Sequence, residues 1–281
     1  MRDTILITGA SGVLGRAIVA AALKAGFAVR QAVRNAKKAN PVTDAVRLDY
    51  ADPSTIAPAL AGVSGVLLMA PPLDPNAPTE LAPVIDEAKA AGVHHLVFIS
   101  AFGANHNEQA PIRIVEHLVI DSGIPYTILR PNFFMENFSQ GFLAGSIKAQ
   151  GAIYLAADDG RTSFISVEDI AAVAVAVFER SVTGQELDLT GPEALDHAEA
   201  ARIITTASGR QVTYHSLTAE QMAAGARAQG MPEPMIGYLT VLYGMVRAGY
   251  AAPITHEVER VTGRQPVRFE GFAKAAAAAW R

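Results

Sequence analysis

The residues best suited to chemistry in this sequence form a glycine-rich segment near its N-terminus. Residues 8–15 read Thr-Gly-Ala-Ser-Gly-Val-Leu-Gly, between a short apolar run typical of a strand and a stretch typical of a helix. In such a turn Gly9 permits the tight bend, Gly12 lets a pyrophosphate approach the backbone, and Gly15 lets the helix pack closely on the sheet. The helix N-terminus presents free N–H groups and a partial positive charge to the phosphates.

This arrangement predicts a dinucleotide-binding site. The residues expected to contact the cofactor in this segment are Gly9, Ser11, Gly12, Val13, Leu14 and Gly15. A glycine-rich turn without a ligand is the alternative. The position between the first strand and the first helix favours the dinucleotide site.

The end of the second expected strand bears on which dinucleotide is bound. Proteins that bind NAD place Asp or Glu there, where it accepts a hydrogen bond from the ribose 2′-hydroxyl. Here the strand ends in Val33 and Arg34, with Lys37 and Lys38 behind it and no acidic residue before Asp44. Arg34 can bind a 2′-phosphate bidentately and Lys38 adds positive charge. We therefore expect NADP(H), with a solvated basic turn as the alternative.

The other expected cofactor contacts follow later strands. They are Asp49 and Tyr50, Ala70 and Pro71, Ser100, and Pro131. The carboxyl ends of parallel strands meet at one edge of a sheet, so these segments should line one crevice. For Asp49, capping the turn into Asp52 and Pro53 is an equal alternative.

The elements that must position these residues alternate regularly through the first half of the chain. Strands are expected at residues 4–8, 27–33, 45–48, 65–69, 96–100 and 126–129, and helices at 13–25, 82–91 and 112–122. Near-continuous apolar strands alternating with helices indicate an α/β fold with a doubly wound parallel sheet, the Rossmann fold. Gly26, Gly92 and Gly123 suit the left-handed position that ends a helix.

The change in this alternation after residue 131 divides the chain into two regions. Residues 1–131 are expected to form the NADP-binding core. Residues 132–281 should supply the remaining sheet elements, a helix at 167–178 and a strand at 186–189, and a smaller, mainly helical lobe that covers the substrate. The chain crosses between the lobes more than once, so the boundary is diffuse.

Composition excludes several classes of function. A net charge of −4 argues against nucleic acid as the main partner, since binding to phosphate backbones requires a basic surplus. The absence of cysteine excludes disulfides and thiolate metal sites, and the seven histidines do not fall into ligand spacings. No segment resembles a membrane span or a signal peptide. We expect a cytoplasmic monomer or homodimer without a metal.

Several further segments carry a family resemblance. They are Leu48–Pro53, Gly123–Pro131, Phe164–Ile170 and Leu189–Pro192. With the glycine turn and the Val33–Asn35 step, they resemble the NmrA-like family of atypical short-chain dehydrogenases, and the similarity extends to Arg264. The resemblance implies the fold and a reductase activity, because bacterial members include NADPH-dependent quinone reductases and triphenylmethane-dye reductases. Other members are cofactor-sensing regulators, and this is the second functional hypothesis.

One departure from short-chain dehydrogenases concerns catalysis. Enzymes of that class that reduce carbonyls use Tyr-x-x-x-Lys, in which the phenol delivers a proton to the developing alkoxide. That motif is absent here, and the expected positions fall near Glu108 and Ile112. Ser100 lacks a Tyr partner and is expected at most to hydrogen-bond the cofactor. No residue is assigned as catalytic.

Without that pair, the reaction that remains possible is hydride transfer to an acceptor that needs no proton from the protein. Quinones, cationic dyes and other conjugated aromatic compounds are of this kind, because their reduced forms are delocalised or neutral. The side chains expected to bind such an acceptor are Pro72, Phe102, Asn132, Phe133, Phe134, Met135 and Asn137. Core packing is the alternative for the apolar ones. A biosynthetic isomerase or reductase with another proton donor is a third hypothesis.

Overall fold

A parallel sheet of seven strands organises the first part of the molecule. The computed structural model describes residues 4–34 and 43–281. The strands are β1 (Thr4–Ile7), β2 (Ala28–Val33), β3 (Asp44–Arg47), β4 (Gly65–Met69), β5 (His95–Ile99), β6 (Tyr126–Pro131) and β8 (Gln185–Leu189). Their order is β3-β2-β1-β4-β5-β6-β8, and every neighbouring pair is parallel. The chain therefore winds outward from β1 in one direction and from β4 in the other.

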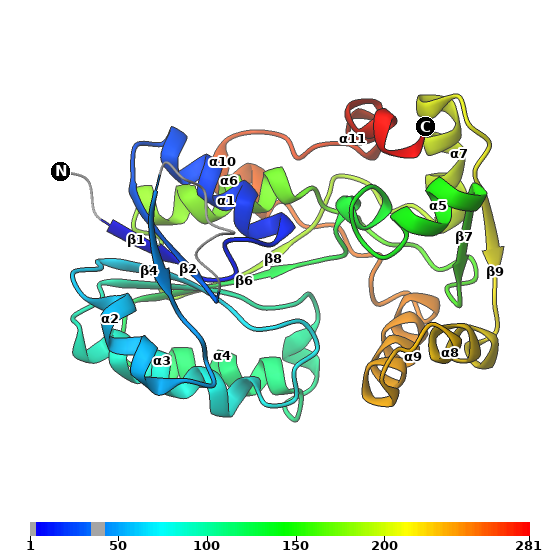
Figure 1. Ribbon diagram of the computed structural model, residues 1–281. Coiled ribbons are helices and arrows are strands. Elements are labelled where there is room, and N and C mark those ends of the chain that lie inside the picture. The colour runs from blue at the N-terminus through cyan, green and yellow to red at the C-terminus, as the bar shows by residue number, and fades with distance from the viewer. Residues whose placement is uncertain (1–3, 35–42) are drawn as a thin grey trace. The chain divides into compact units, whose positions relative to one another are not determined.

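Helices cover both faces of this sheet (Figure 1). On one face lie α1 (Val13–Lys24), α6 (Val167–Glu179) and α10 (Glu257–Thr262), and on the other α2 (Ile56–Leu60), α3 (Ala77–Ala90) and α4 (Pro111–Asp121). Short 3-10 turns, η2 (Pro53–Thr55) and η3 (Ala104–His106), connect them. Leu68 and Phe98 on the strands pack with Leu81 and Val115 on the helices, and all four are fully buried. The predicted doubly wound α/β fold is confirmed.

These elements form unit 1, which comprises residues 1–131, 167–189 and 257–264. The expected strands and helices of this unit match the observed ones within a few residues, except that α3 begins at Ala77 rather than at residue 82. The short helices α2 and α10 were not expected. The start of α3 was not predicted because two prolines, which are rare inside helices, lie in its sequence. Pro78 lies in the first turn, where the N–H it lacks would have no partner within the helix, and Pro83 is accommodated further along. Gly26, Gly92 and Gly123 all have positive φ, as predicted.

Unit 2 comprises residues 132–166, 190–256 and 265–281. It contains α5 (Ala144–Gln150), α7 (His197–Ser208), α8 (Ala219–Ala228), α9 (Glu233–Arg247), α11 (Phe269–Ala276) and the 3-10 turns η4 (Met135–Phe138) and η5 (Ala277–Trp280). Strands β7 (Ala152–Leu155) and β9 (Thr213–Ser216) pair in parallel as a separate small sheet. The expectation of a mainly helical region missed β9, because its sequence Thr-Tyr-His-Ser has no apolar alternation.

Aromatic side chains build the core of unit 2. His197 is 1% exposed, and the rings of Phe138, Phe164 and Tyr214 lie within 6.1 Å of it, centroid to centroid. Burial lowers the pKa of His197 to about 4, so the imidazole is neutral. The Trp280 Nε1–H donates to the Phe138 carbonyl at 2.6 Å. This bond ties residues from the first and last segments of unit 2 together.

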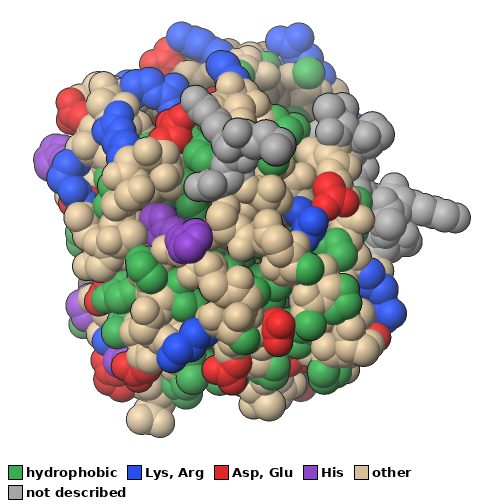
Figure 2. All heavy atoms as spheres, turned by 90° about the vertical axis from the view of Figure 1, so that its left-hand side faces the viewer, with side chains coloured by type: hydrophobic (Ala, Val, Ile, Leu, Met, Phe, Trp, Pro, Cys, Tyr) green, Lys and Arg blue, Asp and Glu red, His purple; other side chains and the backbone are tan. Residues whose placement is uncertain are grey.

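The surface has two plain features. On the face shown in Figure 2, Lys and Arg side chains are interspersed with Asp and Glu side chains. None of the helices in the described residues is both long enough and apolar enough to span a bilayer. Of the two tyrosines on α9, Tyr243 is buried and Tyr238 is 41% exposed.

Candidate functional site

The glycine-rich segment joins β1 to α1 as a tight turn. Gly9 has φ +60°, a conformation in which a side chain is strained, and its carbonyl accepts from the Gly12 N–H at 2.9 Å. Gly12 is the N-cap of α1 and provides no side-chain cap. The N–H groups of the first turn of α1 are therefore left for an anion.

The space around these glycines fits a pyrophosphate. A Cβ on Gly15 would lie 2.1 Å from the Gly9 carbonyl oxygen, so the helix packs on the turn as closely as the backbone allows. A Cβ on Gly12 would have one neighbour, the same oxygen at 3.3 Å, and would otherwise point into open space. Gly12 is also exposed. These glycines provide the tight turn and the open approach that a bound dinucleotide phosphate requires.

The hydroxyl of Thr8 ties this turn to the neighbouring strand. The Thr8 N–H donates to the Leu67 carbonyl at 3.0 Å, and its Oγ1 accepts from the Met69 N–H at 2.7 Å. The two strands so joined, β1 and β4, are those between which the winding direction reverses. In open α/β sheets this reversal point is where ligands bind.

Two arginines supply positive charge beside the turn. Arg34 follows β2 directly and is exposed, as a residue that binds a 2′-phosphate must be. Arg16, one turn into α1, donates from Nη1 to the Ser11 carbonyl at 2.5 Å and was not anticipated. A basic residue four positions after Gly12 was the available signal. Lys38, the other predicted cation, lies outside the described residues.

Asp49 and Tyr50 follow β3. Asp49 Oδ1 accepts from the Ala51 N–H at 3.3 Å, whereas the cap of the next turn is Asp52, whose side chain accepts from the Ser54 N–H. Tyr50 donates its hydroxyl proton to the Met69 carbonyl at 2.9 Å, and burial raises its pKa to about 12. Tyr50 is thus bound to the end of β4, and its contact with the cofactor stays a prediction.

The segments after β4, β5 and β6 lie at the carboxyl edge of the sheet. Ala70 and Pro71 are half-buried, Pro72 is exposed, and Phe102 is half-buried. The Phe102 N–H donates to the carbonyl of Pro131, the last residue of β6, at 3.1 Å. The loop after β5 is thereby fixed to the end of β6.

Ser100 takes part in a buried ionic cluster that the sequence analysis did not anticipate. Its hydroxyl donates to Glu116 Oε1 on α4. Glu116 is fully buried and also accepts from Arg130 Nε at 2.8 Å and Nη2 at 2.7 Å, and from Arg113 Nη1 at 2.7 Å. Arg130 further contacts Glu186. Charged residues inside the apolar runs Ile-Val-Glu-His-Leu and Ile-Leu-Arg-Pro were the available signal.

The positions at which a Tyr/Lys pair would fall hold no proton donor of that kind. Glu108 is exposed and pairs with Arg113 and His117, which lower its pKa. The hydrogen bond from His117 is the largest cause of that lowering. Ile112 is half-buried on α4. A carbonyl-reducing pair is therefore not assembled at these positions.

The remaining predicted substrate residues belong to unit 2. Asn132 is buried, and its amide donates to Ser163 Oγ at 2.8 Å and to the Ala251 carbonyl at 2.9 Å. Met135 is fully buried in the core of unit 2. Both side chains hold unit 2 together, and we leave them out of the proposed acceptor site. Phe133, Phe134 and Asn137 are half-buried and stay predictions.

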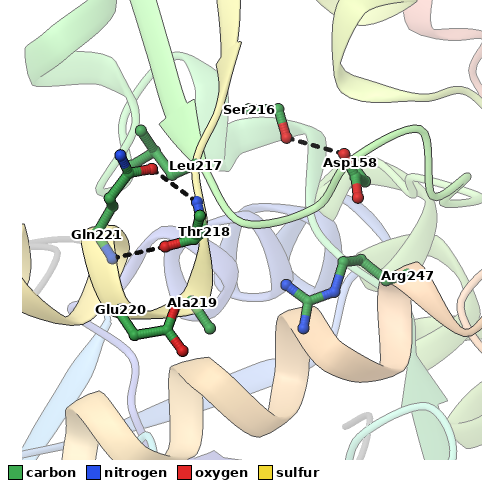
Figure 3. Close-up of a pocket in the computed structure, with 8 residues that line it drawn as sticks. All are labelled: Asp158, Ser216, Leu217, Thr218, Ala219, Glu220, Gln221 and Arg247. Atoms are coloured by element: carbon green, nitrogen blue, oxygen red, sulfur yellow. Dashed lines mark hydrogen bonds between the residues drawn. The ribbon is translucent and has the colours of Figure 1, made fainter.

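Unit 2 also contains a polar hollow of about 430 Å³ beside the start of α8 (Figure 3). It is lined by Asp158, Ser216, Leu217, Thr218, Ala219, Glu220, Gln221 and Arg247. Thr218 and Gln221 cap each other's backbone N–H groups, and Ser216 donates to Asp158. No predicted residue lines this hollow, and its polar groups are largely satisfied. We therefore place the function at the glycine turn.

A glycine turn between the first strand and first helix of this sheet defines a dinucleotide-binding protein. The chain matches the model of the NmrA-like family over residues 1–269, and it belongs to that family. The family predicted from its motifs is confirmed.

Three similar proteins indicate the kind of chemistry in this family. The chain is 34% identical to the NAD(P)H azoreductase of Xenophilus azovorans, covering 98% of this chain and 99% of that protein. The Escherichia coli NADPH-dependent quinone oxidoreductase, solved in complex with NADPH, superposes with a TM-score of 0.85 at 27% identity, over 96% and 99% of the chains. Triphenylmethane reductase from Citrobacter superposes with a TM-score of 0.85 at 25% identity, over 98% and 99%. These relatives support the predicted enzyme class, an NAD(P)H-dependent reductase, and the predicted cofactor, NADP(H).

Proposed function

We propose that this protein transfers a hydride from NADPH to a quinone or another conjugated aromatic acceptor. The observation that carries the NADPH part of this proposal is the open glycine cradle at the start of α1, with Arg34 exposed at the end of β2, the strand paired with β1. The N–H groups of α1 would hold the pyrophosphate, and Arg34 would bind the 2′-phosphate. When bound, NADPH supplies the hydride.

The choice of acceptor follows from which groups can give up a proton. Reduction of a simple carbonyl needs a proton donor at the developing alkoxide. Glu108 is held ionised by Arg113 and His117, Ile112 has no proton to give, and the Ser100 proton is committed to Glu116. A quinone accepts the hydride to give a delocalised phenolate that water can protonate afterwards. A cationic dye becomes neutral without any proton.

The relatives' names agree with this class of acceptor. Azo compounds, quinones and triphenylmethane dyes are the acceptors named for the three similar proteins. All three are conjugated and aromatic. Phe102, which follows β5 at the carboxyl edge of the sheet, is the aromatic side chain that we assign to binding such a molecule.

The test is NADPH oxidation followed by absorbance against quinones, cationic dyes, azo dyes, aldehydes and ketones. We expect turnover with conjugated aromatic acceptors and none with simple aldehydes and ketones. Deuterium at the transferred C4 position of NADPH should give a primary isotope effect. Changing any of the seven tyrosines to Phe should leave kcat within a few-fold.

Two results would contradict the proposal. A Tyr→Phe change that lowers kcat by the roughly 10²–10⁴-fold typical of lost acid catalysis would reveal a proton donor. Tight NADPH binding without reduction of any acceptor would favour a cofactor-sensing protein instead. Gly12→Ala serves as the control variant, because it should lose cofactor binding and turnover together.

A further inference from the structure

We propose that Ser100 binds the carboxamide N–H₂ of the nicotinamide as a hydrogen-bond acceptor, and that Glu116 fixes it in this role. This inference rests on the proposed function, since it concerns the same cofactor. In this role the Ser100 hydroxyl accepts a hydrogen bond from the ligand, whereas a serine that assists catalysis donates one to a substrate oxygen.

The first step concerns the proton of Ser100. Its hydroxyl donates to Glu116 Oε1, and its backbone N–H donates to the Leu129 carbonyl at 2.8 Å. Within the described part of the chain, the Ser100 oxygen accepts no hydrogen bond. A hydroxyl has one proton and two acceptor sites. Ser100 therefore offers a ligand lone pairs and no proton.

The second step concerns the charge on Glu116. A protonated Glu116 could itself donate to Ser100 and release the serine proton. Burial raises the pKa of Glu116, but hydrogen bonds from Arg130, Ser100 and Arg113 outweigh burial and leave the pKa below its usual value. Three guanidinium N–H groups contact its two oxygens at 2.7–2.8 Å. Glu116 is thus an anion that accepts and does not donate.

The third step is the position of Ser100 in the fold. It follows β5 directly, at the carboxyl edge of the sheet. A dinucleotide lies across the reversal point with one nucleotide over each half of the sheet. The glycine turn and Arg34 belong to the half formed by β1, β2 and β3, which leaves the nicotinamide for the half formed by β4, β5, β6 and β8. Strand β5 is the second strand of that half, next to β4.

The fourth step is the chemistry of the partner. A quinone oxygen only accepts hydrogen bonds, so it cannot pair with a serine that offers only lone pairs. The carboxamide of nicotinamide carries an N–H₂ group, the one nitrogen donor of that ring system. The same bond would set the rotation of the ring and so the face from which the hydride leaves.

The test compares NADP⁺ with its 3-acetylpyridine analogue, in which a methyl ketone replaces the carboxamide and removes the N–H₂ donor. Binding of both oxidised cofactors is measured by calorimetry without any acceptor present. We expect Ser100→Ala to weaken NADP⁺ roughly 3- to 10-fold, as for loss of one hydrogen bond, and to change binding of the analogue less than twofold. Ser100→Thr, which keeps a hydroxyl, should restore the preference for NADP⁺.

Two further variants separate this role from a structural one. Ser64→Ala is the matched control, because Ser64 Oγ donates to the Thr4 carbonyl at 3.1 Å at the opposite edge of the sheet. It should leave both affinities unchanged. In Glu116→Gln one side of the amide must face a guanidinium N–H without accepting from it: two such N–H groups lie at the Oε2 position and one, Arg130 Nε, lies at Oε1. The amide oxygen is therefore expected at Oε2, and the amide nitrogen at Oε1 donates to Ser100. Ser100 then turns its proton outward, and the preference for NADP⁺ should disappear.

Equal weakening of NADP⁺ and the analogue by Ser100→Ala would overturn the inference, because it would place Ser100 against the ribose or in a purely structural role. Unchanged affinities for both would overturn it as well. If Glu116→Gln does not fold, the Ser100→Ala comparison decides alone. Failure of the wild-type protein to bind NADP⁺ at all would refute the proposed function itself, which distinguishes the two failures.

Discussion

Replacing Gly12 and Gly15 separately by Ala should separate cofactor binding from stability. At Gly15 the added Cβ would meet the Gly9 carbonyl oxygen at 2.1 Å, the Gly9 carbonyl carbon at 2.7 Å and the Ala10 Cα at 2.8 Å. Carbon contacts normally lie at roughly 3.5 Å or more, so the turn must shift by about 1 Å. Overpacking costs about 1–3 kcal/mol, offset by the roughly 0.5–1 kcal/mol by which Ala favours a helix over Gly. Because the obstructing atoms are backbone, we expect Gly15→Ala to lose about 2 kcal/mol of unfolding free energy.

At Gly12 we expect a small loss of stability and a large loss of cofactor binding. Its Cβ would lie 3.3 Å from one oxygen, and its φ of −75° suits any residue. The expected stability loss is about 1 kcal/mol, because Ala is a poorer N-cap than Gly. The methyl group would occupy the approach of the pyrophosphate and lengthen a charge-assisted hydrogen bond. We expect NADPH to bind at least 10-fold more weakly, from a loss of about 1.5–3 kcal/mol.

Urea unfolding without cofactor measures the stabilities, and fluorescence titration measures NADPH binding. Gly225→Ala is the matched control, because Gly225 lies in α8 with nothing within 4 Å of its Cβ position, and the variant should be slightly stabilised. A Gly15→Ala variant as stable as wild type would refute the close packing of turn and helix. A Gly12→Ala variant that binds NADPH normally would place the phosphates elsewhere.

Three other outcomes follow from single residues. Arg34→Ala should weaken NADPH by about 2–3 kcal/mol and leave NADH almost unchanged; calorimetry that finds equal losses would remove Arg34 from the 2′-phosphate site. Because the pKa of His197 is about 4 in the folded protein and about 6.5 when unfolded, the unfolded chain takes up the proton first. The free energy of unfolding should therefore fall as pH drops from 6.5 towards 4, by about 2 kcal/mol at pH 5. In His197→Phe this dependence on pH, measured by urea unfolding, should be lost, and an unchanged dependence would contradict the assignment. Trp280→Phe should cost about 2–4 kcal/mol of unfolding free energy in the same assay, since it leaves the Phe138 carbonyl without its donor and opens a cavity; a loss below 1 kcal/mol would show that the bond contributes little.

The sequence predicted unit 1 well because its signals are local. Strand β4 is an apolar run that ends just before two prolines, and Gly26 and Gly92 mark helix ends through their positive φ. The glycine turn is equally local, since all its residues lie within one bend. Such features depend on neighbouring residues only, and periodicity and turn chemistry describe them.

The buried ionic cluster could not be predicted in the same way. Ser100, Glu116 and Arg130 come together only because β5, α4 and β6 pack side by side, and each lies 14–16 residues from the next. The sequence placed Ser100 at the edge of the sheet. Whether its hydroxyl donates or accepts a hydrogen bond toward a ligand depends on Glu116, which the sequence did not place beside it. Strand β9 was missed for a similar reason, because its pairing with β7 and not its composition makes it a strand.

The segmentation of unit 2 has a consequence for synthesis on the ribosome. Strands β1 to β6 all lie within the first 131 residues, and β8 is added later at the edge of the sheet, so pairing can begin while the chain is still being made. The core of unit 2 instead needs Phe138 from its first segment, Ile204 from its second and Trp280 from its third. At about 5–20 residues per second, the interval between these residues lasts on the order of ten seconds. Through that interval the apolar side chains of the first segment lack their partners, and the nascent chain is most exposed to misfolding there.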